Sequence, residues 1–246
     1  PAETYYPWAN RDIVWGNAKN YVQDYCQGSH DRMPIPENVN AGIRDAKEHG
    51  FLVTYCHPGW SLNHYPDYCW IEGADFVEVY NSACVFSGRP DDVAEHTFWD
   101  FLCLNKPVSP TCSDDSHGIE TVGLGATYVK ADALTYEDVI RSLKCGDTFA
   151  STGPKFKDIA FDPETCTVSV ESDPVEVISI TTNIRTAKKA GMLERAIITE
   201  GEFDLSEFVK VTRDYGIFDQ SFFRVNLFGP GGKRAYSRGY FLRDLL

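Results

Sequence analysis

Two different patterns of hydrophobic and polar positions follow each other along the chain, and they meet near Pro154. Before this proline, short apolar runs that fit buried strands alternate with stretches whose apolar residues recur at helical spacing. After it, the pattern predicts only extended segments separated by turn residues. Strands that alternate with helices are typical of parallel βα units, whereas a run of short strands is typical of a sandwich. The sequence therefore predicts an α/β domain over 1–154 and a small antiparallel all-β domain, sandwich-like, over 155–246.

The helices of the first part carry recognisable start and stop signals. Pro36 can open a helix that Gly50 ends, with its apolar face formed by Val39, Ile43 and Ala46. Another helix is expected between the capping residue Thr135 and Gly146, with its apolar face formed by Val139, Ile140 and Leu143. A third helix is expected over 90–104. Strands are expected over 51–56, 76–80, 107–112, 126–130 and 148–151, and extended segments after Pro154 over 156–161, 165–171, 175–182, 196–199 and 222–228.

Composition narrows the class of protein. The 246 residues are 43% hydrophobic and 24% charged, which is ordinary for a globular protein and excludes disorder, collagen and coiled coil. Lys and Arg number 23 against 36 Asp and Glu, a net charge of −13 that repels nucleic acid and anionic lipid. Residues 1–154 hold 22 of the acidic and 10 of the basic side chains. Such a half is either a solvated acidic surface or a source of cation ligands.

The cysteines and the start of the chain bear on its location. The eight cysteines show no C-x-x-C pairing, and several sit in apolar runs, which fits reduced core thiols in a cytoplasmic protein. No apolar stretch approaches the roughly 20 residues that span a bilayer, and the first residues show no secretory signal pattern. We therefore expect no membrane partner. The chain does not begin with Met, so we expect it to be processed or a fragment.

His57 is the first candidate for chemistry, because it comes directly after the strand expected over 51–56. In parallel βα folds, functional groups gather where the strands end, because the loops that follow converge on one face. A lone histidine is more often a structural residue, but Pro58 and Gly59 directly behind it indicate a loop with a tight course. Trp60, in the same loop, is a candidate to stack on a substrate or simply to cover the core.

The second candidate is Cys-Ser-Asp-Asp-Ser-His at 112–117, at the end of the third expected strand. In an extended segment, Asp115 and His117 point to the same side. Oxygen and nitrogen donors together suit zinc, manganese or iron, although Asp-Asp-Ser is also ordinary turn chemistry. Together with His57, this cluster is the best candidate for a metal site, and Asp114 beside it is a candidate to bind substrate.

Three further residues are weaker candidates. Glu78 lies within the strand over 76–80 and is expected to point inward, where a carboxylate needs a partner or a cation. Asn81, at the end of that strand, is better placed to face a ligand. Arg89 could contact a phosphate, but a surface role is more common for an arginine. The sequence contains no G-x-S-x-G elbow, P-loop or G-x-G-x-x-G motif, so it offers no sign of serine-hydrolase or nucleotide-binding chemistry.

Taken together, these motifs resemble the PHP (polymerase and histidinol phosphatase) family, in particular its bacterial metal-dependent phosphoesterases. The resemblance covers about 36–246. It rests on Cys-His-Pro-Gly-Trp-Ser at 56–61, Val-Glu-Val-Tyr-Asn at 77–81, Ser-Asp-Asp-Ser-His at 113–117, Val-Lys-Ala with Leu-Thr-Tyr-Glu-Asp at 129–138, Phe-Ala-Ser-Thr-Gly-Pro at 149–154 and Arg-Ala-Tyr-Ser-Arg-Gly-Tyr at 234–240.

The resemblance implies the C-terminal part of a seven-stranded βα barrel, TIM-like, followed by a small β domain. In this family two or three ions of zinc, manganese or iron at the strand ends hydrolyse a small-molecule phosphate ester. His57 matches a histidine ligand, and Asp115 and His117 match the closing D-x-H ligands. Glu78 and Asn81 match a recurring strand of the family without a definite ligand role.

The chain also departs from the family, because the H-x-H motif of the first strand and the later T-D-H motif do not occur in it. Three ligands can hold one ion at most, whereas a two-metal site clamps both the attacking and the leaving oxygen. We therefore expect impaired activity in this chain. We also expect the parent gene to encode further residues before Pro1 that carry both motifs, and an incomplete barrel to self-associate through its open edges.

Two classes of function follow from the sequence. The first is a PHP-type phosphoesterase. The second is a non-catalytic binding or scaffold protein that retains a degenerate metal site. The metal content of the full-length protein would separate them.

Overall fold

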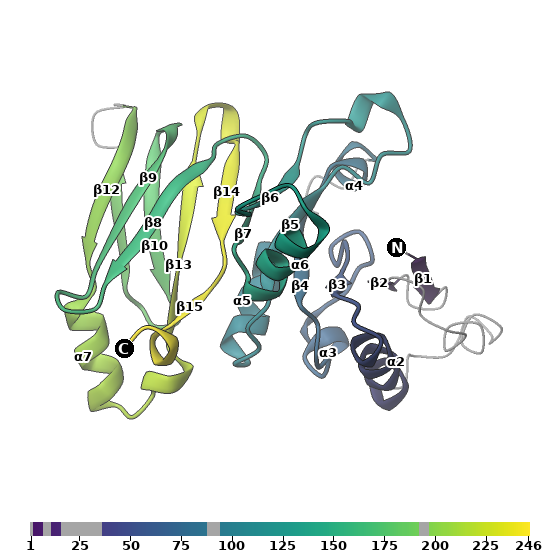
Figure 1. Cartoon of the computed structure of the whole chain (residues 1–246), viewed down its shortest axis with the longest axis horizontal. Helices are drawn as coiled ribbons and strands as arrows, with labels where there is room; N and C mark the ends of the chain where they lie inside the picture. Colours follow the sequence, from purple (N-terminus) through teal and green to yellow (C-terminus); the bar gives the residue numbers. More distant parts are fainter. Residues whose placement is uncertain (1, 7–10, 16–35, 88–93, 192–196) are drawn as a thin grey trace. The chain divides into compact units, whose positions relative to one another are not determined.

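The computed structural model describes residues 2–6, 11–15, 36–87, 94–191 and 197–246 (Figure 1). These residues form a mixed α/β chain that groups into two compact units, each described here by itself. The first unit consists of Pro1–Ala126 and Lys130–Asp147, and the second of Thr127–Val129 and Thr148–Leu246. The predicted domains, 1–154 and 155–246, are segments expected to fold independently. Compactness does not show independent folding, so these domains stay a prediction. Among the described residues, no helix is long and apolar enough to cross a membrane.

The first unit is built on an open sheet of five strands in the order β1-β2-β3-β4-β5. Strands β2 and β3 pair antiparallel, whereas β3, β4 and β5 are parallel to one another. The sheet is not closed, so the described strands do not form the predicted barrel. The strands are β1 (Ala2–Tyr6), β2 (Arg11–Trp15), β3 (Val53–Tyr55), β4 (Phe76–Asn81) and β5 (Ser109–Ser113).

Strand β4 lies between β3 and β5 and is buried along most of its length. Its sequence, Phe-Val-Glu-Val-Tyr-Asn, is the near-continuous apolar run expected of a parallel strand with both faces covered, apart from one glutamate. Val77 and Val79 are fully buried. The register of β4 against β5 shifts between Glu78 and Tyr80, which marks a β-bulge.

Among its described residues this unit has five helices, and the predicted apolar face of α2 is confirmed. Val39, Ile43 and Ala46 are all buried on α2. In α5, Phe98 and Phe101 are buried completely. The helices are α2 (Pro36–Glu48), α3 (Tyr65–Tyr68), α4 (Ser82–Phe86), α5 (Glu95–Cys103) and α6 (Tyr136–Cys145).

The predicted caps of α6 are also confirmed. The hydroxyl of Thr135 accepts a hydrogen bond from the main-chain N–H of Asp138, and Gly146 ends the helix at φ 70°. Its predicted apolar face is only half-buried, because Val139, Ile140 and Leu143 all have intermediate exposure.

In its described residues the second unit contains two sheets, built mainly of antiparallel pairs. One has seven strands, in the order β11-β10-β13-β14-β7-β6 with β15 paired to β13, and the other has three strands in the order β12-β9-β8. The strands are β6 (Ala126–Val129), β7 (Thr148–Ser151), β8 (Phe156–Asp162), β9 (Thr167–Val175), β10 (Val177–Thr182), β11 (Ala187–Gly191), β12 (Ile198–Asp204), β13 (Phe222–Phe228), β14 (Arg234–Ser237) and β15 (Tyr240–Phe241).

Two strands that the sequence analysis assigned to βα units belong to the seven-stranded sheet instead. Strand β7 pairs antiparallel with β14, with Ser151 opposite Ala235, and β6 lies beside β7. This pairing joins segments far apart along the chain. Local periodicity therefore predicts that β6 and β7 are strands but not which sheet they join.

Residues of both sheets share one apolar cluster, whereas the predicted sandwich-like domain stays a prediction. Val168 and Val170 of β9 contact it from the smaller sheet, and Phe223, Val225 and Leu227 of β13 from the larger one.

The prediction that this part contains only extended segments is wrong. A helix, α7 (Ser206–Asp214), joins the cluster through Phe208 and Val209, with Thr212 buried on the same face. Its β-branched and aromatic residues favour strands locally, and packing against the cluster overrides that preference.

Candidate active site at the ends of three parallel strands

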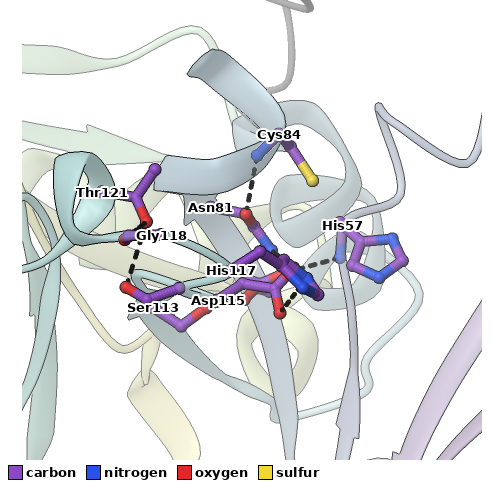
Figure 2. A network of polar contacts seen from close by, with 10 residues as sticks. His57, Asn81, Cys84, Ser113, Asp115, His117, Gly118 and Thr121 are labelled. Atoms are coloured by element: carbon purple, nitrogen blue, oxygen red, sulfur yellow. Dashed lines mark hydrogen bonds and ion pairs between the residues drawn. The ribbon is translucent and has the colours of Figure 1, made fainter. Parts of the chain in front are cut away.

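A pocket of about 280 Å³ opens where β3, β4 and β5 end. Parallel strands bring their following loops to the same edge of a sheet, so residues far apart in the sequence meet there. Figure 2 shows His57, Cys84 and the pair Asp115 and His117, which come from the segments after β3, β4 and β5. The lining residues are His57, Trp60, Ala83, Cys84, Ser87, Asp115 and His117.

His57 lies two residues beyond β3 and is only 6% exposed. Its Nδ1 lies 3.0 Å from the Oγ of Ser61, and its ring meets that of Trp60 edge-on at 5.3 Å between centroids. The main-chain N–H of His57 donates to Oε2 of Glu78 at 2.7 Å. Its φ of 27° is uncommon for a residue other than glycine, and such a conformation is maintained by the contacts around it.

Glu78 is buried beneath the pocket, with 5% of its surface exposed. Oε1 accepts a hydrogen bond from the hydroxyl of Ser113, and Oε2 accepts from the main chain of His57 and from Nδ2 of Asn81. Burial raises the pKa of Glu78 above its usual value, and the hydrogen bonds and the nearby His57 oppose that rise only in part. The partner predicted for this inward carboxylate is thus a set of hydrogen-bond donors.

Asn81 connects the buried carboxylate to the pocket wall. Its Nδ2 donates to Glu78 and, at 3.2 Å, to Oδ2 of Asp115, while its Oδ1 accepts from the main-chain N–H of Cys84 at 3.0 Å. It therefore caps α4 and orients Asp115 at once. Asn81 is 1% exposed and is not among the lining residues, so its predicted contact with a substrate stays a prediction.

Asp115 and His117 form the side of the pocket that follows β5. His117 Nε2 lies 3.5 Å from Oδ1 of Asp115, and the His117 side chain is 77% exposed against 24% for Asp115. Asp115 also has a positive φ, of 45°. The structure thus brings His57, Asp115, His117 and Trp60, all predicted from the sequence, to one pocket.

Asp114, the neighbouring carboxylate, is turned away to hold a loop. It accepts hydrogen bonds from the Ser82 hydroxyl and from the main-chain N–H groups of Gly123, Leu124 and Gly125. Burial alone would raise its pKa, but these hydrogen bonds lower it below its usual value. Asp114 does not line the pocket, so its predicted substrate contact stays a prediction, and Arg89 lies outside the described residues.

The donor atoms around the pocket decide whether it suits the metal that the sequence resemblance implies. Within the described ranges, no three His, Cys, Asp or Glu side chains are grouped so that they could hold a metal ion. His57, Asp115 and His117 share a pocket, but as placed they do not form a coordination sphere. Their role as ligands stays a prediction, and no chemical step is assigned to a metal here.

Sequence reasoning missed two parts of this site. Cys84 and Ser87 line the pocket, although the cysteines were interpreted as packing residues. Ser61 and Ser113 hold His57 and Glu78 in place. One feature of the sequence could have indicated Cys84. Asn81 is a favourable N-cap residue, and a helix that begins directly after it places Cys84 beside the strand ends.

Comparisons with known proteins give one similarity. No family model matches the chain, and no curated protein matches it. A solved structure of a two-domain protein from Bacteroides vulgatus ATCC 8482, which contains a predicted PHP-like metal-dependent phosphoesterase, is similar over 97% of this chain and 73% of its own, at 13% identity and a TM-score of 0.40. At this score the likeness does not establish a shared fold.

Proposed function

We propose that this chain carries the active-site pocket of a PHP-type phosphoesterase, which hydrolyses a small-molecule phosphate ester with divalent metal ions of the zinc, manganese or iron type. The observation that carries the proposal is the shared pocket: His57, Asp115 and His117, the three residues matched to family motifs, line it together. A cavity of about 280 Å³ suits a small ligand. The proposal also includes four expectations from the sequence. The chain binds neither nucleic acid nor membranes, it self-associates, and it is located in the cytoplasm.

The side chains of the pocket suit proton transfer. Imidazole exchanges protons near neutral pH, which makes both histidines candidates to protonate a leaving oxygen or to accept a proton from water. The carboxylate of Asp115, 3.5 Å from Nε2 of His117, is placed to orient that ring. Trp60 supplies an apolar wall next to His57.

The experiment combines metal analysis with turnover. The purified chain is loaded with zinc, manganese or iron, its metal content is measured by mass spectrometry, and hydrolysis of p-nitrophenyl phosphate is followed. His57→Ala and Asp115→Asn should lower kcat/KM by about 100-fold or more, the scale of lost acid–base catalysis. His49→Ala is the matched control, because His49 is exposed at the end of α2.

A second function is favoured by the donor set itself. Because the described residues form no group that could hold a metal ion, a non-catalytic binding or scaffold protein with a degenerate metal site is the alternative. It predicts that the purified chain retains no metal, as measured by mass spectrometry, and that it cleaves no aryl phosphate. That pair of results would contradict the phosphoesterase.

A further inference from the structure

Glu78 occupies a position where an apolar residue would pack without penalty. It lies on the central parallel strand β4, between the fully buried Val77 and Val79. Taking a carboxylate out of water costs several kcal/mol unless hydrogen bonds or an opposite charge offset the loss. In the described part of the chain, no lysine or arginine forms an ion pair with Glu78; its partners are the donors given above. A residue this costly in a strand core needs a reason other than packing.

The contacts of Glu78 supply that reason, because they reach the ends of three strands. The main-chain N–H of His57 comes from the segment after β3, Asn81 ends β4, and Ser113 ends β5. Asn81 carries the connection on to Asp115 through its second N–H. One buried carboxylate therefore links the two sides of the pocket, His57 on one and Asp115 on the other.

The backbone at these two residues shows what the linkage has to maintain. His57 and Asp115 have φ values of 27° and 45°, a region that residues other than glycine enter only with backbone strain. Such conformations persist only where surrounding contacts fix them. The hydrogen bond from the N–H of His57 to Glu78 acts directly on this backbone.

The bulge in β4 explains how the carboxylate reaches these donors. The register against β5 shifts between Glu78 and Tyr80, and the carbonyl of Val79 accepts a hydrogen bond from the N–H of Ala94. Bulges redirect side chains and are common beside active sites. Here the bulge falls directly after Glu78, at the end of the sheet where the pocket opens.

We propose that Glu78 is the positioning residue of this pocket: by accepting hydrogen bonds from His57, Asn81 and Ser113 it fixes the relative placement of the His57 and Asp115 side chains. Its effect on hydrolysis rests on the proposed function, whereas its effect on the geometry of the pocket does not. Glu78 acts through hydrogen bonding, so an uncharged acceptor of the same shape can replace it.

The test compares Glu78→Gln, which keeps an acceptor oxygen for His57 and Asn81, with Glu78→Leu, which has a similar volume and no acceptor. The imidazole resonances of His57 are followed by two-dimensional NMR of the ¹⁵N-labelled, metal-free chain. They are assigned as the resonances that are lost in His57→Ala. Glu48→Leu on the exposed end of α2 is the matched control. We expect the His57 resonances to move in Glu78→Leu and to stay at their wild-type positions in Glu78→Gln and in the control.

Turnover of p-nitrophenyl phosphate is the second readout. Loss of a residue that orients the groups of a site typically costs 10–100-fold, so kcat/KM should fall by that factor in Glu78→Leu and be largely retained in Glu78→Gln. If Glu78→Leu does not fold, Ser113→Ala removes one donor to the carboxylate and should move the same resonances by less.

Each failure has a distinct meaning. Unchanged His57 resonances in Glu78→Leu, or in Ser113→Ala where that variant stands in, would overturn the positioning role even if hydrolysis is found. An equal loss of kcat/KM in Glu78→Gln and Glu78→Leu would overturn the positioning role, because it would show that the charge of Glu78 is required. Shifted resonances in a chain that cleaves no phosphate would support the positioning role and contradict the phosphoesterase.

Discussion

The apolar cluster of the second unit and the polar network under the pocket are both buried, but different forces hold them. The cluster includes hydrophobic side chains from β9, β10, β12, β13, β14 and α7, together with Leu205 and Leu242, and their burial is favourable in any orientation. The network consists of Glu78, Asn81, Ser113 and the main chain of His57, joined by hydrogen bonds that work only in one geometry.

This contrast separates buried residues that packing explains from buried residues that require a functional interpretation. In the cluster, burial of apolar side chains itself stabilises the fold, so a buried residue there needs no further explanation. In the network, a buried carboxylate weakens packing and gains only directional contacts. We therefore expect substitutions in the cluster to change stability most, and substitutions around the pocket to change its chemistry more than its stability.

The largest expected effect is in the cluster. Phe223 is completely buried and lies 5.2 Å from the ring of Tyr240, between centroids. Phe223→Ala should lower the free energy of unfolding by about 3–5 kcal/mol, because it removes a large buried ring and leaves a cavity. Urea unfolding followed by near-UV circular dichroism measures this, with Leu134→Ala, at a 99% exposed residue, as the control. A smaller loss of stability than in a variant of a polar residue around the pocket would contradict the greater stabilising role assigned to the cluster.

Next in size is the loop held by Asp114. Asp114→Asn replaces one acceptor oxygen by a donor, so at least one main-chain N–H among Gly123, Leu124 and Gly125 loses its partner. These residues are exposed or half-buried, so water can replace part of the lost contact, and we expect the free energy of unfolding to decrease by about 0.5–1.5 kcal/mol. Asp132→Asn, whose side chain is 91% exposed, serves as the control. An effect as large as that of Phe223→Ala would show that the polar side of the comparison carries equal stability.

A smaller effect is expected from pH. Burial, and then the hydrogen bond to Asp100, raise the pKa of Tyr68 well above its usual value of about 10. Above pH ~10 the unfolded chain loses the Tyr68 proton, whereas the folded chain keeps it. The contribution of this group to stability is therefore fully present below pH ~10 and is lost as the pH rises further. Thermal unfolding from neutral to strongly alkaline pH should show a shallower fall in Tyr68→Phe than in the wild type. Tyr136→Phe, at an exposed tyrosine, should follow the wild type.

The smallest expected change in stability is at His117. Its side chain is 77% exposed, so His117→Ala should alter the free energy of unfolding by no more than about 0.5 kcal/mol. If the pocket hydrolyses phosphate esters, the same variant should still lower kcat/KM. Urea unfolding and the aryl phosphate assay on one preparation separate the two quantities. A large loss of stability with unchanged turnover would reverse the expected difference between the two regions.

Local signals predicted the elements well, and they failed where distant segments decide the outcome. The buried face of α2, the caps of α6 and the bounds of β7 and β13 follow the sequence, because each depends on neighbouring residues. The open sheet, the membership of β7 in the second unit and the helix α7 depend on pairing and packing between segments far apart in the chain.

The same distinction applies to the site. The sequence alone could predict that His57, Asp115 and His117 lie in one pocket, because each follows a strand of a parallel set. The different roles of the adjacent Asp114 and Asp115 could not be predicted, because they depend on which carboxylate meets the turn at Gly123–Gly125. The partners of Glu78 likewise depend on a one-residue bulge that strand periodicity does not reveal.

The cysteines give the pocket a chemical reporter of its own. None of the seven described cysteines forms a disulfide; Cys103 and Cys145 are exposed, whereas Cys84 is 5% exposed and lines the pocket. An alkylating reagent should therefore modify the two surface thiols first and reach Cys84 slowly. Any molecule that enters the pocket should slow the alkylation of Cys84 and leave that of the other two unchanged. Mass-spectrometric footprinting of this thiol can thus screen candidate ligands directly, before any turnover assay exists.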